Sequence, residues 1–238
     1  MATGVGINDQ TRDGLQLPSL QHPFGTDEVG RDIFVRSFYG LQTDLLLVFL
    51  AVPVSFLLGT TLGMLRVFAH WLGELGQRTV DIILGFPSII LGLAIIAVLG
   101  PGFWSLFTAI VIAGIPPFGR LARTNLLALE SRDFIAAAKA FGVPKRKLII
   151  RHYIPNSAGP LLTQFALALI GAVGLSAVMS VIGLGIQPPN TSLGALISAG
   201  LRQVYVQLGY VIGPALVFMA LVIAFNLIAD GLAEWKDD

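Results

Sequence analysis

The sequence predicts an all-α membrane protein with five transmembrane helices. Only 12% of its 238 residues are charged, whereas a soluble domain carries about 25%. Hydrophobic residues make up 55% of the chain, and the mean hydropathy is +0.79. They gather in uncharged runs long enough to cross a bilayer, which takes about 20 residues of helix. Because these runs do not alternate with polar residues, they favour helices over membrane strands.

Five apolar spans account for the uncharged runs. They are expected near residues 45–65, 81–99, 103–119, 157–182 and 209–229. A turn at Gly100-Pro101-Gly102 separates the second span from the third, because glycine and proline interrupt helices. Residues 183–208 are rich in glycine, proline and serine, which predicts a loop that contains a short helix.

The spans divide the chain into three parts. Residues 1–41 form a polar N-terminal segment, residues 42–232 form the transmembrane domain, and residues 233–238 form a tail. The N-terminal segment lacks the apolar run of a signal peptide. No linker and no internal repeat interrupts residues 42–232, so one membrane domain is predicted.

Basic residues set the predicted orientation, since lysine and arginine near span ends favour the cytoplasmic side. Residues 120–151 hold 8 of the 15 lysines and arginines, against two acids. We name residues 120–156 the basic segment and predict that it is cytoplasmic. The loops 100–102 and 183–208 together hold one basic residue, Arg202. The N-terminal segment is therefore expected outside the cell, and the C-terminal tail inside.

The basic segment also carries a helix-break-helix pattern. Ser131 is predicted to cap a short helix that starts at Arg132. Gly142 would end this helix in the left-handed conformation, and Pro144 would prevent its continuation. A second short helix is expected over residues 145–152. Alanines in the first helix would let another protein approach closely; alternatively, anionic lipid would hold this lysine-bearing helix on the membrane surface.

Three blocks of the sequence resemble the permeases of bacterial ABC importers. They read HPFGTDEVGRDIFVRSFYG at 22–40, ESRDFIAAAKAFGVPKRKLIIRHYIPN at 130–156 and VIGLGIQPPNTSLGALI at 181–197. The middle block is similar to the EAA loop of those permeases, although Ala136 stands where that pattern has glutamate. Over about residues 22–234, the chain resembles the inner-membrane permease subunit of the dipeptide, oligopeptide and nickel branch. Most relatives in that branch have one more transmembrane helix before the first block.

The resemblance implies a fold and a set of functional residues. Five helices would form the core of an importer permease. The residues implied to contact an ATPase are Arg132, Asp133, Ala137, Ala138, Lys139, Phe141, Gly142 and Val143. The residues implied to face an external binding protein are Gly25, Thr26, Asp27, Gly30, Arg31, Asp32, Gln187, Pro188 and Pro189. The translocation pathway would include Gly171, Gly174 and Gln164.

The resemblance further implies partners and a location. The partners would be two ATPase subunits, a second homologous permease subunit, an external substrate-binding protein and membrane lipid. The chain has no Gly-Lys dipeptide and so no Walker A sequence; we expect ATP and Mg²⁺ on the ATPase subunits, and no cofactor or metal in this chain. A net charge of +1 gives no reason to expect nucleic acid. We expect a multi-pass protein of the bacterial inner (cytoplasmic) membrane that is not itself an enzyme.

The predicted function is ATP-driven import of dipeptides or oligopeptides. Import of nickel or a nickel complex by the same machinery is the alternative within this class. Outside the class, the rivals are an ion-coupled secondary transporter and a membrane scaffold. An ion relay would need charged groups inside the spans, and Asp44, Asp81 and Asp230 are expected only at span ends.

Overall fold

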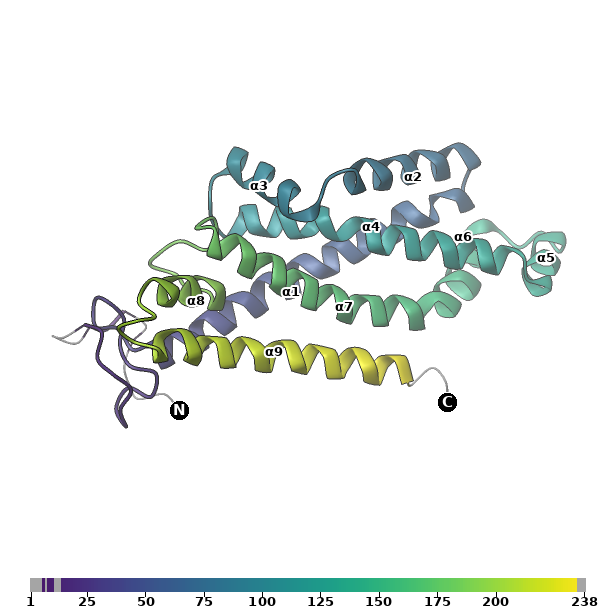
Figure 1. The fold of residues 1–238 in the computed structure, drawn as a ribbon. Coiled ribbons are helices and arrows are strands. Elements are labelled where there is room, and N and C mark those ends of the chain that lie inside the picture. Colours follow the sequence, from purple (N-terminus) through teal and green to yellow (C-terminus); the bar gives the residue numbers. More distant parts are fainter. Residues whose placement is uncertain (1–5, 7, 11–13, 235–238) are drawn as a thin grey trace.

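The computed structural model describes residues 6, 8–10 and 14–234 of the chain as an elongated bundle of helices (Figure 1). Among these residues, four helices are long and apolar enough to cross a membrane, and a bent pair of shorter helices makes a fifth span if the pair is counted as one. The β pairings in the described part of the chain are two isolated bridges close to the N-terminus. The predicted all-α fold class is therefore confirmed.

The helices follow one another with short connections. In chain order they are α1 (Ile33–Met64), the 3₁₀ turn η1 (Leu65–Val67), α2 (His70–Leu84), α3 (Ser88–Leu99), α4 (Phe103–Glu130), α5 (Asp133–Ala140), α6 (Lys145–Leu148), the π turn η2 (Ile149–Tyr153), α7 (Ile154–Val181), α8 (Leu193–Arg202) and α9 (Gly209–Glu234). Helix α1 packs against α4, α7 and α9. The N-terminal segment and α8 lie at one end of the bundle, the N-terminal end, and α5 and α6 lie at the other, the hairpin end (Figure 1).

Two glycines on α1 allow a close contact between α1 and α4. A β-carbon at Gly59 would lie 2.5 Å from the carbonyl oxygen of Ile115 on α4. A β-carbon at Gly63 would lie 2.4 Å from the carbonyl oxygen of Gly119. These distances are too short for any side chain, so the glycine pair lets the two helix backbones touch, as small residues do between membrane helices.

Substituting Gly63 by valine is expected to destabilise the bundle. The added carbons would meet the backbone of α4, which cannot yield without separating the helices; overpacking of this kind costs about 1–3 kcal/mol. Gly231→Val is the matched control, since a β-carbon at Gly231 of α9 meets nothing within 4 Å. Thermal unfolding of the detergent-purified variants measures the effect. Equal unfolding temperatures for the two variants would contradict the close contact.

The span predicted at 81–99 is not continuous. Helix α2 ends at Leu84, α3 begins at Ser88, and the two axes differ by 87°. The break falls at Gly85-Phe86-Pro87. Proline disfavours the helical conformation of the residue before it and has no N–H to donate, which favours a break at this point. Prolines inside α1, α4, α7 and α9 do not end those helices, so Pro87 alone does not explain the break. The expectation of one unbroken helix over these residues was therefore wrong, although the bent pair still makes a fifth span when it is counted as one.

The charged connections are shorter than predicted, because the long helices extend beyond the apolar spans. Helix α4 runs on to Glu130, so the first part of the basic segment is helical. Two arginines in this extension bind α2: Arg123 donates to the carbonyl of Gly73 at 3.1 Å, and Arg120 pairs with Asp81 at 3.4 Å. These polar contacts stabilise the part of α4 that lies beyond its apolar span.

The first and last long helices extend beyond the predicted limits 42–232 of the transmembrane domain. Asp32 caps α1 by accepting hydrogen bonds from the backbone N–H groups of Phe34 at 2.8 Å and Val35 at 3.3 Å. Helix α1 therefore starts at Ile33, inside the predicted 1–41 segment. At the other end, α9 extends to Glu234, and residues 235–238 of the predicted tail lie outside the described part of the chain.

Candidate functional site

A short helical hairpin built on α5 forms the tip of the hairpin end (Figure 1). Gly142 follows α5 with φ +72°, in the left-handed region that favours glycine. The N–H of Gly142 donates to the carbonyl of Lys139 at 3.0 Å, and the N–H of Val143 donates to the carbonyl of Ala138 at 3.1 Å. These two bonds form a Schellman motif. The predicted left-handed conformation of Gly142 and its position at the end of the short helix are confirmed.

Two local predictions for the basic segment were wrong. The hydroxyl of Ser131 does not cap α5; it donates back to the carbonyl of Ala128 at 2.9 Å. Helix α6 does not end near residue 152, because it continues through the π turn into α7. Pro155 has no N–H to donate and its ring would meet the carbonyl four residues earlier. The wider π turn, in which the N–H of Ile154 reaches the carbonyl of Ile149, accommodates it without ending the helix.

The hairpin is fixed to the bundle by a small core of its own. Five buried residues from separate elements form this hairpin core: Val67, Leu126, Ile135, Leu148 and Tyr153. Polar contacts surround it. Lys139 pairs with Glu130 at 3.2 Å, and Lys145 donates to the carbonyl of Phe68 at 2.6 Å. A push on α5 would therefore move η1, α4 and the start of α7 together.

The outer face of the hairpin is exposed and partly apolar. Phe141 is 88% exposed, and Phe134 and Ala137 are exposed beside it. An aromatic side chain left open at the tip of a rigid hairpin is typical of a protein-binding surface. Two of the residues predicted to contact an ATPase, Ala138 and Val143, are partly buried against the hairpin core. The other six are exposed: Arg132, Asp133, Ala137, Lys139, Phe141 and Gly142.

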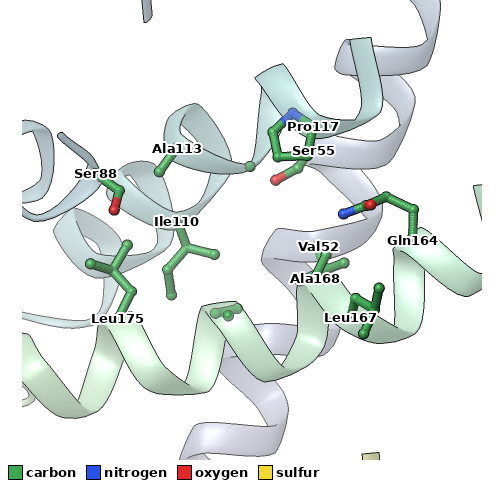
Figure 2. Close-up of a pocket in the computed structure, with 13 residues that line it drawn as sticks. Val52, Ser55, Ser88, Ile110, Ala113, Pro117, Gln164, Leu167, Ala168 and Leu175 are labelled. Carbon is green, nitrogen blue, oxygen red and sulfur yellow. The ribbon is translucent and has the colours of Figure 1, made fainter. Parts of the chain in front are cut away.

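A cavity of about 250 Å³ lies between α1, α4 and α7 in the middle of the bundle (Figure 2). Its lining is mainly apolar, with Ser55, Ser88 and Gln164 as polar exceptions. Two of the three predicted pathway residues, Gln164 and Gly171, line this cavity, and Gly174 does not. Gly171 is exposed and a β-carbon there would meet nothing within 4 Å, so the cavity opens onto an uncovered face of α7.

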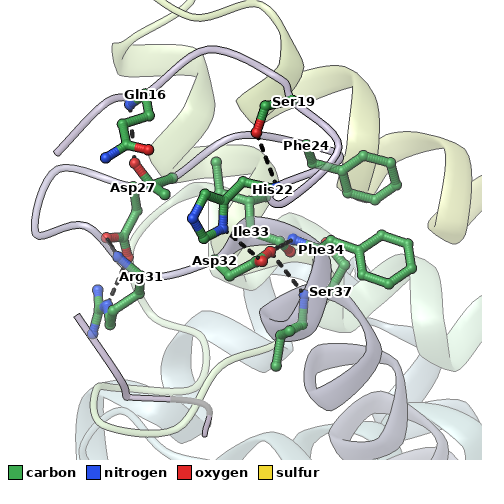
Figure 3. A network of polar contacts seen from close by, with 12 residues as sticks. Gln16, Ser19, His22, Phe24, Asp27, Arg31, Asp32, Ile33, Phe34 and Ser37 are labelled. Carbon is green, nitrogen blue, oxygen red and sulfur yellow. Dashed lines mark hydrogen bonds and ion pairs between the residues drawn. The ribbon is translucent and has the colours of Figure 1, made fainter. Parts of the chain in front are cut away.

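The predicted partner-facing residues at the N-terminal end divide into buried and exposed groups, and Figure 3 shows the polar contacts of three of them, Asp27, Arg31 and Asp32. Thr26, Asp27 and Asp32 are buried, and their oxygens accept hydrogen bonds from this chain. Asp27 accepts from the backbone N–H of Arg31 at 2.9 Å and from its Nε at 2.6 Å. Gly25 and Gly30 are buried with positive φ. These residues build the N-terminal turn.

The exposed part of that predicted face comes from the loop between α7 and α8. Gln187, Pro188 and Pro189 are exposed, and a cis peptide bond joins the two prolines. The amide of Gln187 donates to the carbonyls of Gly183 at 3.2 Å and Gly185 at 3.0 Å, which holds the loop in shape. Contact with an external protein at this loop, and at the half-buried Arg31, stays a prediction.

Asp44 is a structurally important residue whose buried contacts were not predicted from the sequence. It lies inside α1, is 2% exposed, and accepts a hydrogen bond from the backbone N–H of Leu193 at 2.9 Å. The hydroxyl of Ser176 on α7 donates to its other oxygen at 3.4 Å. Asp44 thus joins α1 to α7 and to the N-terminus of α8. The signal that could have found it is the presence of an ionisable residue next to a long apolar run.

Asp44→Ala is expected to lower the stability of the protein, because it leaves the N–H of Leu193 buried without its acceptor. Removing the acceptor of a buried donor costs about 1–3 kcal/mol. Asp44→Asn keeps one carbonyl oxygen and should lose less. Thermal unfolding in detergent tests whether Asp44→Ala loses more stability than Asp44→Asn. Asp230→Ala on α9 is the control, because Asp230 is an exposed acidic residue. An alanine variant as stable as that control would show that Asp44 does not hold α8.

Comparison with known sequences gives a consistent result. The profile of the family described as "Binding-protein-dependent transport system inner membrane component" matches residues 51–237. The chain is 39% identical over 224 residues to the dipeptide transport system permease protein DppC of Alkalihalophilus pseudofirmus, which covers 94% of this chain and 74% of that protein. It is 36% identical over 221 residues to the glutathione transport system permease protein GsiD of Escherichia coli, covering 92% and 73%.

Solved structures share the fold at low sequence identity. A chain of the MetNI methionine ABC transporter in an inward-facing conformation aligns with a TM-score of 0.69 at 19% identity, covering 85% of this chain and 96% of that chain. A chain of an amino acid ABC transporter aligns with a TM-score of 0.63 at 20% identity, covering 85% and 93%. At this level of identity the likeness concerns the arrangement of the helices.

Proposed function

This chain belongs to the family of binding-protein-dependent transport system inner membrane components, and from that premise we propose that it is the permease subunit of an ATP-driven importer of short peptides. A member of this family is a multi-pass transport subunit and not an enzyme. The peptide cargo rests on the two relatives named for dipeptide and glutathione transport. We place the protein in the bacterial inner membrane, where it would form the translocation pathway with a second, homologous permease.

The hairpin end carries this proposal. Its exposed Phe141 lies on a rigid unit that is joined to three elements of the bundle through the hairpin core. We propose that two ATPase subunits, which hold ATP and Mg²⁺, dock on the hairpins of the two permeases. Closure of the ATPases around ATP would push α5, and the hairpin core would pass this motion to α4 and α7. The N-terminal end would then receive peptide from an external binding protein.

Co-purification tests the docking surface. An ATP-hydrolysing subunit should co-purify with the tagged chain, and Phe141→Ser should reduce its amount at least about tenfold, as expected for a central aromatic contact. Tyr205→Ser is the matched control, because Tyr205 is a fully exposed aromatic residue between α8 and α9. If both variants retain the ATPase subunit equally, the hairpin tip is not the docking surface.

The proposed topology is testable because the native chain contains no cysteine. With the N-terminal end outside, cysteines at the exposed positions Ser19 and Asn190 should react with a membrane-impermeant thiol reagent added to intact cells. A cysteine at the exposed Ser131, beside the hairpin, should react only after the cells are opened. The reverse pattern of labelling would overturn the orientation and, with it, the cytoplasmic docking of the ATPase.

A further inference from the structure

A second cavity, of about 460 Å³, lies at the N-terminal end of the bundle. Its walls come from the N-terminal segment, the loop between α7 and α8, one face of α8 and the start of α9. We name it the arginine cavity, because Arg31, Arg36 and Arg202 all line it. Glu28 and Tyr210 are also part of the lining. Its volume falls within the range of about 300–1,000 Å³ that is typical of small-molecule sites.

The arginine cavity has charged groups of both signs in and directly behind its lining. The buried Asp27 lies behind its wall and pairs with Arg31 at 2.6 Å, while Arg36 lies 3.8 Å from the same carboxylate oxygen. Glu28 accepts a hydrogen bond from the hydroxyl of Tyr210 at 3.2 Å. Three arginines thus face two carboxylates, which leaves one positive charge in excess in and directly behind the lining.

Arg202 is the guanidinium that supplies this excess. It is exposed at the end of α8, while Arg31 and Arg36 are tied to Asp27. A guanidinium presents five N–H donors in a planar fork that matches a carboxylate. Glu28 adds an acceptor of opposite charge to the same cavity. The cavity therefore offers a cationic and an anionic group to one small solute.

We propose that the arginine cavity binds a short peptide by its two charged termini. Arg202 receives the terminal carboxylate, with Arg31 and Arg36 adding positive potential behind it, and Glu28 receives the terminal ammonium. This inference rests on the proposed import of peptides and assigns a subsite for that cargo, separate from the mid-bundle cavity at Gln164. The cavity would hold the peptide at the N-terminal end before it enters the pathway.

Ser198 provides a reporter for this binding, since it lines the cavity and the chain has no native cysteine. The assembled transporter carrying Ser198→Cys, in nanodiscs without the binding protein, is alkylated with a maleimide, and the rate is followed on this chain. Saturating Ala-Ala should slow alkylation at least about threefold, because binding lowers the fraction of transporters with an empty cavity by the factor 1 + [L]/Kd. Ala-Ala amide, which lacks the carboxylate, should give no protection, and acetyl-Ala-Ala, which lacks the ammonium, should protect less.

Arginine variants test whether Arg202 contacts the carboxylate of the peptide. Arg202→Gln in the Ser198→Cys background should abolish protection by Ala-Ala, whereas Arg78→Gln, an exposed arginine on α2, should leave it unchanged. Protection that persists in Arg202→Gln, or that Ala-Ala amide gives equally well, would overturn the proposal. Protection by the binding protein alone, with none from Ala-Ala, would also overturn it and assign the cavity to an acidic side chain of that protein. ATP-driven peptide uptake measured on the same preparation reports on the proposed function separately.

Discussion

Gly142→Val is expected to reduce ATP-driven uptake about tenfold or more while the bundle remains folded. Gly142 has φ +72°, a conformation that costs a residue with a β-carbon about 1–2 kcal/mol. A β-carbon there meets nothing within 4 Å, so the effect acts through the backbone of the Schellman turn and not through a clash. A displaced turn would move Phe141 away from the docked ATPase. Loss of about 1.4 kcal/mol of coupling free energy corresponds to a tenfold reduction in uptake.

Two matched substitutions separate coupling from folding in this experiment. Gly142→Asn should retain more activity than Gly142→Val, because asparagine tolerates the left-handed conformation better than other side chains. Gly231→Val adds the same side chain at an open helical position and should transport normally. Uptake and ATP hydrolysis are measured together in proteoliposomes. Normal, coupled uptake by Gly142→Val would show that the hairpin geometry does not transmit the work of the ATPase.

Gly171→Trp is expected to block uptake and to leave ATPase binding intact. Gly171 lines the mid-bundle cavity and is exposed on α7, where a second permease would face it under the proposed function. Because a β-carbon at this position meets nothing within 4 Å, the indole can enter without disturbing the fold of this chain. An indole is large beside a cavity of about 250 Å³ and would fill the space available to a peptide.

The position of the pathway is tested by comparing this variant with Gly231→Trp on α9, which is equally open. The control should import peptide at the normal rate. Both variants should retain the ATPase subunits, because neither residue belongs to the hairpin or to the hairpin core. Uptake by Gly171→Trp at the rate of the control would remove the mid-bundle cavity and Gly171 from the translocation pathway.

The features that could be predicted from the sequence depend on local backbone demands and on the length of apolar runs. The left-handed Gly142, the stop at Pro144 and the short helix in the 183–208 loop each follow from a few neighbouring residues. The all-α fold follows from uncharged stretches that can satisfy their backbone groups in lipid only as helices. Both kinds of inference need no knowledge of which elements meet in space.

The features that could not be predicted depend on contacts between distant residues. In the extension of α4, Arg123 binds the carbonyl of Gly73, which lies 50 residues earlier in the sequence. The N-terminal turn is joined to the loop before α9 by Gln207, whose amide donates to the carbonyl of Gln16, 191 residues away. The buried contact of Asp44 could not be read from hydropathy, because its partner, the N–H of Leu193, lies 149 residues away in the sequence. Hydropathy reports the preference of a segment for lipid and does not report such partners.

The most direct test of the proposed function is uptake of a labelled dipeptide by proteoliposomes that contain the purified complex. The chain is co-expressed with the second permease, the ATPase subunits and the binding protein. We predict uptake only when hydrolysable ATP and Mg²⁺ are present on the hairpin side and the binding protein is present on the opposite side. A proton or sodium gradient without ATP should give no uptake. Uptake driven by such a gradient in the absence of ATP would contradict the assignment of this chain as an ATP-driven permease subunit.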